Sequence, residues 1–432
     1  MDTGTTAYML IATALVLLMT PGLAFFYGGL VKAKSVVSMM MMSFGAIGLI
    51  GVLWALYGYA IAFSSPVVGD GAVATVAGVK GWFAIDTANL GLDGLLANGG
   101  GADYTDLSFA AFQATFAIIT VALVSGAIAD RAKFWSWMLF AGVWATLVYF
   151  PVASWVFNFG LADDGSFAYG GWATKGLQNI FGVGVIDFAG GTAVHINAGA
   201  AALALALVLG KRVGFSKGMS APHNPPFVLL GAGLLWFGWF GFNAGSELAP
   251  DNTASVAFIN TLIAPAAALL AWIVVEKFKD GKSTSVGAAS GAVAGLVAIT
   301  PACGSLHPIW AIVLGIVAGA VCALAIDLKF KLGFDDSLDV VGIHLIGGLI
   351  GTLYLGFFAN GTGLFMGSDG TQLLVQAIVA FSVLIYSFVL AFAIGWIIEK
   401  TIGFRIKNED ELAGVDLVVH GEEGYVLADA KA

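Results

Sequence analysis

Charged side chains are scarce in this chain of 432 residues. Only 10% of them are Asp, Glu, Lys or Arg, whereas a soluble domain carries about 25%. That scarcity excludes an ordinary soluble domain. The 18 basic residues are scattered along the chain, and the formal net charge is −9. Without a basic cluster, the sequence predicts no nucleic-acid partner.

Cysteine is nearly absent as well. The chain has only Cys303 and Cys322, and they do not form a CxxC pair. This pattern predicts neither a redox centre nor a metal site. We therefore expect both cysteines to be packing residues, and we expect no metal and no cofactor.

Hydrophobic residues, in contrast, make up 59% of the chain, and the mean hydropathy is +0.93. A helix that crosses a membrane needs about 20 apolar residues, and eleven runs suit that purpose, the eighth being short. The sequence predicts an all-α polytopic membrane protein with eleven transmembrane helices. The expected spans are residues 8–31, 38–63, 108–129, 134–157, 190–210, 227–246, 254–275, 286–301, 309–326, 340–360 and 373–398.

The distribution of basic residues predicts the orientation of these spans. Lysine and arginine concentrate in the cytoplasmic loops of membrane proteins. With the N-terminus outside and the C-terminus in the cytoplasm, 16 of the 18 basic residues are cytoplasmic, and only Lys80 and Lys175 lie outside. The first span is full-length and lacks a basic start, so we expect it to be retained rather than cleaved as a signal peptide.

The loops are too short to form a separate soluble domain. We expect a transmembrane domain over residues 1–398 and a cytoplasmic tail over residues 399–432. A tail of that size cannot build its own core, and its composition alone predicts a disordered end. Function must then be sought among the helices.

Two of the five histidines fall inside predicted spans, His195 in the fifth and His344 in the tenth. An internal duplication of five spans would place equivalent residues in these positions. An odd number of spans per repeat makes the two repeats inverted, and inverted repeats commonly hold a substrate path at their interface. We expect repeats over about 8–210 and 227–360, followed by an eleventh helix over about 373–398. Each histidine taken alone could equally be a packing residue.

An acidic residue precedes each histidine. Asp187 lies eight residues before His195, and Asp339 lies five residues before His344. Either carboxylate could cap the first free N–H groups of its helix. For Asp339 we expect a helix cap alone. For Asp187 both a cap and a functional role stay open.

If the two imidazoles meet, one can donate a hydrogen bond and the other accept it. Burial favours the neutral form of both rings. A neutral pair inside an apolar pore suits a small polar or neutral molecule, or one that loses its charge. No segment resembles a carbonyl-lined filter for hydrated alkali ions.

Six motifs resemble those of one membrane-protein family. They are "PGLAFFYGGLV", "DFAGGTAVHINAGAAAL", "GKRVGF", "WFGFNAGS", "TPACG" and "DVVGIHLIGG". In this order, and over nearly the whole chain, they are similar to the ammonium transporter (Amt/Mep/Rh) family, in its bacterial or archaeal Amt type. The resemblance implies an eleven-helix protomer, a homotrimer with one pore per subunit, and uptake of ammonium.

The resemblance also assigns pore residues. His195 and His344 resemble the twin pore histidines of the family, and Phe116 and Phe242 resemble two stacked rings that close the pore from outside. Ammonium would lose its proton near these rings, and ammonia, with or without the proton, would pass the histidine pair. Potassium has no proton to lose, so this mechanism would reject it. Without the resemblance, Phe112 and Phe116 would be interpreted as an ordinary i,i+4 packing pair on one helix.

The resemblance implies an outer recruitment site for ammonium made from Phe112, Phe157 and Ser246, with Asp187 as its electrostatic support. Aromatic faces attract a dehydrated cation. Relatives often have tryptophan in place of Phe157 and histidine in place of Ser154. Phenylalanine is the weaker cation–π partner. Trp155, two residues earlier, should face elsewhere on its helix.

The tail carries the segment "GVDLVVHGEEGYV" from Gly414 to Val426. It resembles the C-terminal segment of the family, which lies under the pore and docks PII signalling proteins. The resemblance therefore implies a PII partner at the cytoplasmic face of a protein in the plasma membrane.

Three other functions stay open at this point. An Rh-type gas channel for ammonia or carbon dioxide would share the fold and the histidines but carry no current. An ammonium sensor would act through a partner, since the short tail argues against a signalling domain of its own. An intramembrane enzyme would need a nucleophile or a metal set, and the sequence has neither paired carboxylates nor an HExxH motif. We therefore expect no enzymatic activity.

Overall fold

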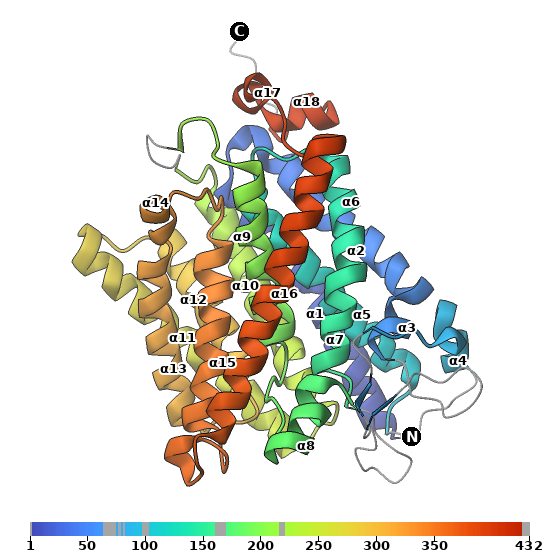
Figure 1. Ribbon diagram of the computed structural model, residues 1–432. Coiled ribbons are helices and arrows are strands. Elements are labelled where there is room, and N and C mark those ends of the chain that lie inside the picture. The colour runs from blue at the N-terminus through green and yellow to red at the C-terminus, as the bar shows by residue number, and fades with distance from the viewer. Residues whose placement is uncertain are drawn as a thin grey trace.

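The computed structural model describes residues 2–63, 75–76, 79–80, 83–96, 103–159, 170–215 and 221–425. These residues form a bundle of long, roughly parallel and antiparallel helices (Figure 1). We call the end of the bundle that carries the N-terminus the N-terminal face. The opposite end, where residues 408–420 lie, is the tail face.

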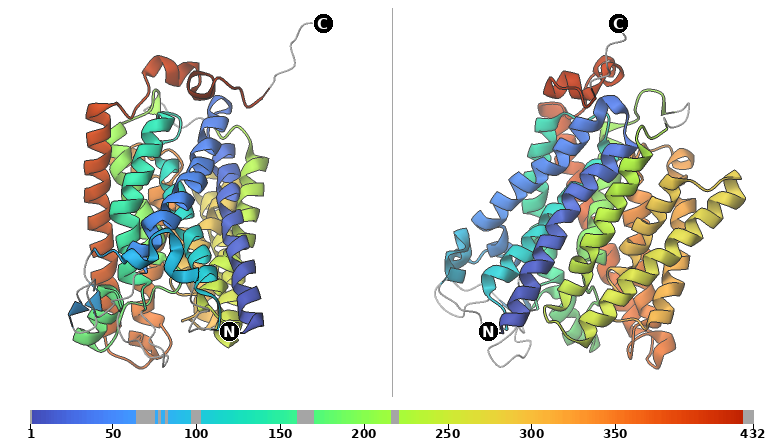
Figure 2. Two further views of the ribbon diagram at one scale, coloured as in Figure 1. Left: turned by 90° about the vertical axis from the view of Figure 1, so that its right-hand side faces the viewer. Right: turned by 180° about the vertical axis from the view of Figure 1, so that it is seen from behind.

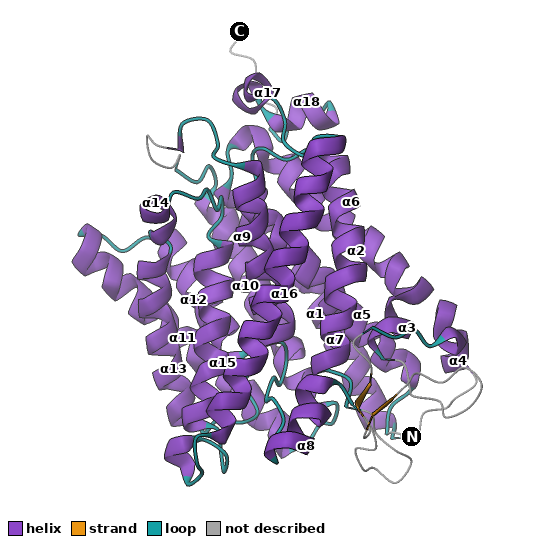
Figure 3. Ribbon diagram, viewed as in Figure 1, coloured by secondary structure: helices purple, strands orange, loops and turns teal. Residues whose placement is uncertain are grey.

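In the described part of the chain, eleven α-helices of more than ten residues build most of the bundle, together with α7, the continuation of α6. They are α1 (Thr3–Leu30), α2 (Val36–Leu53), α5 (Asp106–Val124), α6 (Phe134–Trp144), α7 (Phe150–Val156), α9 (Asn197–Leu209), α10 (Pro225–Ala244), α11 (Asn252–Asp280), α12 (Ser285–Ile299), α13 (Pro308–Ala325), α15 (Ile346–Phe358) and α16 (Thr371–Thr401). Shorter elements connect them. These are α3 (Tyr59–Ala62), α4 (Asp93–Leu96), α8 (Leu177–Phe181), α14 (Leu328–Leu332), α17 (Asn408–Ala413) and α18 (Val415–His420). Two short antiparallel strands of two residues each, β1 (Thr75–Val76) and β2 (Val79–Lys80), pair near the N-terminal face (Figure 3).

Ten helical segments in the described part of the chain are long and apolar enough to cross a membrane. Each coincides with one of the expected spans. The eighth expected span, residues 286–301, corresponds to α12, which has only 15 residues and is about 22 Å long. Its glycines pack closely on the neighbouring helix: a Cβ on Gly291 would lie 2.6 Å from the side chain of Trp272.

Four of these segments contain a π-helical turn, a feature that hydropathy does not reveal. Trp54–Gly58 joins α2 to α3, and Ala145–Tyr149 joins α6 to α7. Gly191–Ile196 precedes α9, and Val341–Leu345 precedes α15. Such turns are frequent at functional sites, and the last two contain the two histidines of the predicted spans.

Helices α1 and α10 pack backbone against backbone. A Cβ on Gly29 would lie 2.7 Å from the carbonyl oxygen of Asn224, and a Cβ on Gly231 would lie 2.2 Å from the backbone nitrogen of Phe26. Only glycine permits so close an approach. This contact brings the inner faces of both helices to the centre of the bundle.

The prediction of a disordered tail is wrong for its described part. Helices α17 and α18 lie across the tail face (Figure 2). Asp416 accepts hydrogen bonds from the backbone N–H groups of Val37 and Ser38 at 3.0 and 2.7 Å, and Glu411 accepts one from Val213 at 2.7 Å. Specific polar contacts thus replace the hydrophobic core that the tail lacks. The expected tail also includes residues 426–432, which lie outside the described residues.

Candidate functional site

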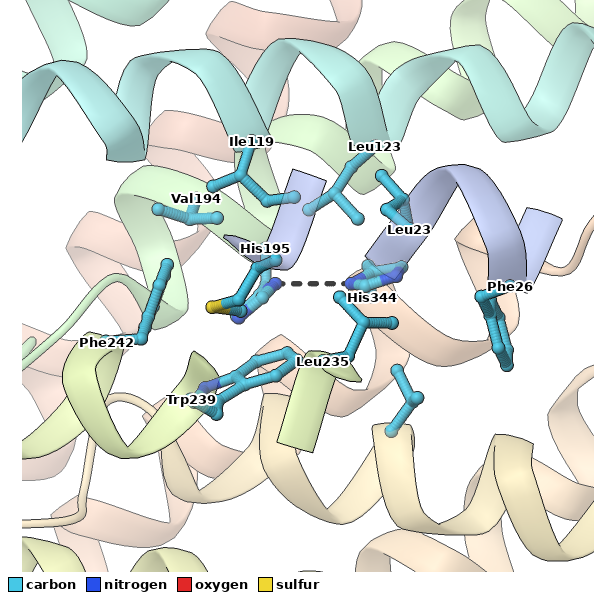
Figure 4. Close-up of a pocket in the computed structure, with 12 residues that line it drawn as sticks. Leu23, Phe26, Ile119, Leu123, Val194, His195, Leu235, Trp239, Phe242 and His344 are labelled. Carbon is cyan, nitrogen blue, oxygen red and sulfur yellow. Dashed lines mark hydrogen bonds between the residues drawn. The ribbon is translucent and has the colours of Figure 1, made fainter. Parts of the chain in front are cut away.

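His195 and His344 meet at the centre of the bundle. Their Nδ1 atoms are 3.2 Å apart, within hydrogen-bond distance (Figure 4), and their exposed fractions are 1% and 3%. A hydrogen bond between two Nδ1 atoms needs a proton on only one of them. The neutral rings must therefore adopt opposite tautomers.

An apolar cavity surrounds the histidine pair. Of the twelve side chains that line it, nine are aliphatic, thioether or phenyl groups, and the others are the two imidazoles and one indole. They are Met19, Leu23, Phe26, Ile119, Leu123, Val194, His195, Leu235, Trp239, Phe242, Val293 and His344. Phe242 lies on the His195 side of the pair, and Phe26 lies on the His344 side (Figure 4). No formal charge lines this cavity, so a cation inside it would be poorly solvated.

Two stacked phenyl rings adjoin the cavity at the His195 side. The ring centroids of Phe116 and Phe242 are 4.2 Å apart, with an angle of 25° between the planes. The ring of Phe242 also stacks on His195, at a centroid distance of 6.2 Å. Both phenylalanines are buried. The structure thus brings together the four residues that the sequence assigned to the pore.

Three of the residues assigned to recruitment surround this ring pair. Phe112 contacts Phe116 edge to face at 4.9 Å, and Phe157 contacts Phe116 in the same way at 6.2 Å. The hydroxyl of Ser246 donates a hydrogen bond to the carbonyl oxygen of Phe242 at 2.7 Å. Ser246 is half-buried, whereas the three phenylalanines are buried.

Trp155 faces elsewhere, as expected from its position two residues before Phe157. Its ring packs against Tyr386 at 4.7 Å and against Trp172 at 5.8 Å. It therefore does not fill the place near Phe116 that a tryptophan at position 157 would occupy.

Asp187 caps the turn that carries His195. Its carboxylate accepts hydrogen bonds from the backbone N–H groups of Gly190, Gly191, Thr192 and Ala193, and from the hydroxyl of Thr192. The cap that the sequence left open is thus present. Five donors fix the start of this turn and with it the direction of the imidazole.

The expectation that Asp339 caps the helix of His344 is wrong. Asp339 has a left-handed backbone with φ of +62°, and its carboxylate pairs with the Nζ atom of Lys329 at 2.5 Å. Asp336 supplies the cap instead, accepting a hydrogen bond from Val341 N–H at 2.7 Å. Asp336 precedes His344 by eight residues, the same spacing as between Asp187 and His195. This equal spacing was a signal that could have identified it.

Sequence reasoning also missed Trp239. Its indole stacks on the His195 ring at 5.5 Å and 24°, and its Nε1–H donates to the hydroxyl of Thr300 at 2.8 Å. Both residues lie inside motifs that carried the family resemblance, "WFGFNAGS" and "TPACG". The indole forms one wall of the cavity and restricts the ring of His195.

A buried charge cluster lies at the tail face. Arg212 bridges Asp130 at 3.0 Å and Asp335 at 2.9 Å. Burial lowers the pKa of Arg212, but its hydrogen bonds to Asp335 and the two carboxylate charges raise it above its usual value. Burial lowers the pKa of the neighbouring Arg131 to about 10.

In the described residues, no group of three or more histidine, cysteine, aspartate or glutamate side chains could hold a metal ion.

Comparisons with known proteins agree on one family. The model of the Ammonium Transporter Family matches residues 7–425. An ammonium transporter of Mycobacterium tuberculosis (strain ATCC 25618 / H37Rv) is 52% identical, covering 99% of this chain and 91% of its own. Ammonium transporter Amt1 of Archaeoglobus fulgidus is 40% identical, covering 98% of this chain and 100% of its own.

Solved structures give the same result. The crystal structure of Saccharomyces cerevisiae Mep2 superimposes with a TM-score of 0.79 at 33% identity, covering 94% of this chain and 91% of that one. Together with the ten apolar helices, these matches identify a multi-pass membrane protein. The chain belongs to the ammonium transporter family.

Proposed function

We propose that this protein conducts ammonium nitrogen across the membrane by taking the proton from ammonium and passing ammonia through the apolar cavity. The observation that carries the proposal is the contact between His195 and His344 at 3.2 Å inside that cavity. A neutral imidazole pair offers a donor and an acceptor to ammonia without placing a fixed charge in the membrane.

The order of events follows from the free energy that is needed to bring a charged ion into the apolar cavity. An ammonium ion would lose its hydration on entering a cavity lined by aliphatic and aromatic groups, and that loss is expensive. Removal of its proton near Phe116 and Phe242 makes passage favourable. Potassium has no proton to give up, so the same barrier excludes it. The proton either returns to the outside or follows by way of the histidines.

Recruitment of ammonium is assigned to Phe112, Phe157 and Ser246. Rings around Phe116 can stabilise a dehydrated cation through cation–π attraction, worth about 0.5–2 kcal/mol per ring. The carbonyl and hydroxyl oxygens near Ser246 can accept N–H groups. Asp187 adds a buried negative charge beneath this region, partly neutralised by the N–H groups that it caps.

We further propose that the N-terminal face is outside and the tail face is cytoplasmic. Short α12 would complete eleven transmembrane helices, arranged as two inverted repeats and a final helix. The equal spacing of Asp187 and Asp336 from their histidines supports such repeats. A homotrimer in the plasma membrane, with one pore in each subunit, is the expected assembly.

Purified protein in liposomes tests this function. We expect an inward ammonium gradient to drive uptake that potassium does not reduce, with empty liposomes as the control. Simultaneous current recording distinguishes an electrogenic transporter from an electroneutral gas channel. Absence of ammonium uptake above the control would refute the function.

The tail is proposed as the docking site for a PII signalling protein. Helices α17 and α18 expose Leu412, Leu417 and Val418, with exposed fractions of 62%, 57% and 47%, which suits a protein contact at the tail face. We expect PII to bind there and block flux when nitrogen is plentiful. Undiminished PII binding after removal of residues 414–432 would refute the role of the tail.

A further inference from the structure

Asp336 is a buried acid with an unused hydrogen-bonding oxygen. Its exposed fraction is 1%. Its Oδ2 atom accepts the hydrogen bond from Val341 N–H at 2.7 Å, whereas its Oδ1 atom is buried and has no hydrogen-bond partner in the described part of the chain. A buried carboxylate oxygen without a partner is costly, so this oxygen calls for an explanation.

The contrast with Asp187 is informative. Both acids precede a histidine by eight residues and cap the turn that carries it. Burial raises the pKa of Asp187, but Asp187 accepts hydrogen bonds from four backbone N–H groups and one hydroxyl, which oppose that rise by stabilising its ionised form. Asp336 has one such bond from Val341. A carboxylate with a free oxygen can take up a proton without losing its cap.

Three ionisable side chains face Asp336. Lys329 donates a hydrogen bond to the backbone oxygen of Asp336 at 3.1 Å and also pairs with Asp339. Tyr27 packs against Gly126, and Ser337, the residue after Asp336, donates a backbone hydrogen bond to the carbonyl oxygen of Ala127 at 3.2 Å, so Tyr27 lies near Asp336. Burial and, to a smaller extent, the Asp339 charge raise the pKa of Asp336 to about 6, against the opposing effects of the Lys329 charge and the Val341 N–H bond. A group that exchanges protons works best with a pKa near the ambient pH.

The position of Asp336 in the bundle suits a role in proton exchange. Phe26 lines the cavity on the His344 side (Figure 4), and the next residue is Tyr27, whose hydroxyl is bonded to the carbonyl oxygen of Leu123 at 3.0 Å. Asp335 and Ser337, the neighbours of Asp336 in sequence, bind Arg131 in the charge cluster at the tail face, so Asp336 lies between the cavity and that face. A proton leaving the histidine pair toward the tail face would pass this region.

We propose that Asp336 exchanges the transported proton with the solvent at the tail face. The inference rests on the proposed function, in which ammonium separates into ammonia and a proton. The proton crosses the histidine pair, binds the free Oδ1 of Asp336 to give the carboxylic acid, and then leaves to water, which restores the carboxylate. Asp187, fully hydrogen-bonded, remains a cap at the other end.

The variant Asp336→Asn separates this role from capping. Its amide oxygen can still accept the Val341 N–H bond, but it cannot take up a proton. In liposomes, we expect the ammonium-driven current per folded protein to fall at least fivefold and its change between pH 5 and pH 7 to disappear. Asp327→Asn is the matched control, because Asp327 pairs with Lys279 at the surface. This control variant should keep the wild-type current and its pH dependence.

Unchanged current and pH dependence in Asp336→Asn would overturn the proposal. If that variant does not fold, Asp336→Ser offers a hydroxyl to the same N–H group, and failure of both to fold would assign Asp336 a purely structural role. Wild-type protein that takes up ammonium without current would also overturn the proposal while leaving the proposed function intact. Wild-type protein that takes up no ammonium would refute the function itself.

Discussion

The carboxylate of Asp416, in the last helix of the tail, accepts a hydrogen bond from the backbone N–H of Ser38 at 2.7 Å, and a second from Val37. Both donors belong to the first turn of α2, whose N-terminal N–H groups have no partner within the helix. Asp416 therefore caps α2 from the far end of the chain and fastens the tail to the bundle.

Replacing Asp416 by alanine should loosen this attachment. Loss of a helix cap costs about 0.5–2 kcal/mol, enough to raise the detached fraction of the tail several-fold. Limited proteolysis should then remove the tail faster in Asp416→Ala than in wild type. Glu409→Ala, at an exposed tail residue, is the control and should leave the rate unchanged. Equal cleavage of all three proteins would show that Asp416 does not hold the tail.

Acid stability should depend on the charge cluster at the tail face. Burial raises the pKa of Asp335, but hydrogen bonds and charge from Arg212 outweigh it and hold the pKa below 3.8. A pKa lowered by folding contributes stability that is complete above the unfolded value and is lost as the pH falls through the folded value. This contribution should thus be constant between pH 5 and pH 8 and decline below about pH 4.

The variant Asp335→Asn tests that contribution. It leaves buried Arg212 with Asp130 alone, and breaking a buried pair costs about 3–5 kcal/mol. Thermal unfolding in detergent should show a lower midpoint than wild type at pH 7, and the gap should narrow below pH 4. A gap that stays constant down to pH 3 would contradict this account of Asp335.

The ring pair of Phe116 and Phe242 should control entry to the cavity. Phe242→Leu removes the stack on Phe116 and the contact with His195 but keeps a similar volume. We expect ammonium flux per folded protein to fall several-fold, because the lost aromatic face no longer stabilises the arriving cation. Phe237→Leu, at an exposed position of the same helix, is the control. Full flux in Phe242→Leu would remove the ring pair from the mechanism.

Hydropathy and charge were sufficient to predict the helices but not their internal irregularities. Each long helical segment falls on a predicted apolar run, since length and apolar composition are additive along the chain. The π-helical turns at Gly191–Ile196 and Val341–Leu345 were not predictable, because they depend on packing between segments distant in sequence. The same holds for the tail, which Glu411 and Asp416 order through contacts with remote backbone groups.

In the candidate site, too, some residues could be predicted from the local sequence and others only from contacts between distant segments. The histidines were found because a polar side chain inside an apolar run is conspicuous, whereas their contact was only a condition in the sequence analysis and is seen in the structure. Asp339 was mistaken for a cap because a carboxylate near a helix start usually serves as one, whereas its backbone turns its side chain toward Lys329. Trp239 escaped notice because an indole in an apolar helix resembles any packing residue until its stacking on His195 is seen.

The central claim is that the contact between His195 and His344 gives the pore its selectivity as well as its rate. His195→Asp places a fixed carboxylate in the cavity, which can compensate a bare cation, so potassium should begin to compete with ammonium. His344→Ala removes the ring that His195 contacts, and it should slow ammonium transport more than it reduces the yield of folded protein. Purely structural histidines would instead affect the yield alone.

Flux of ammonium and potassium, measured in the same vesicles and normalised to folded protein, tests this claim most directly. The account predicts a lower ammonium flux in His344→Ala and a lower ammonium-to-potassium ratio in His195→Asp, both relative to wild type. Ammonium flux and cation preference equal to wild type in both variants would contradict it.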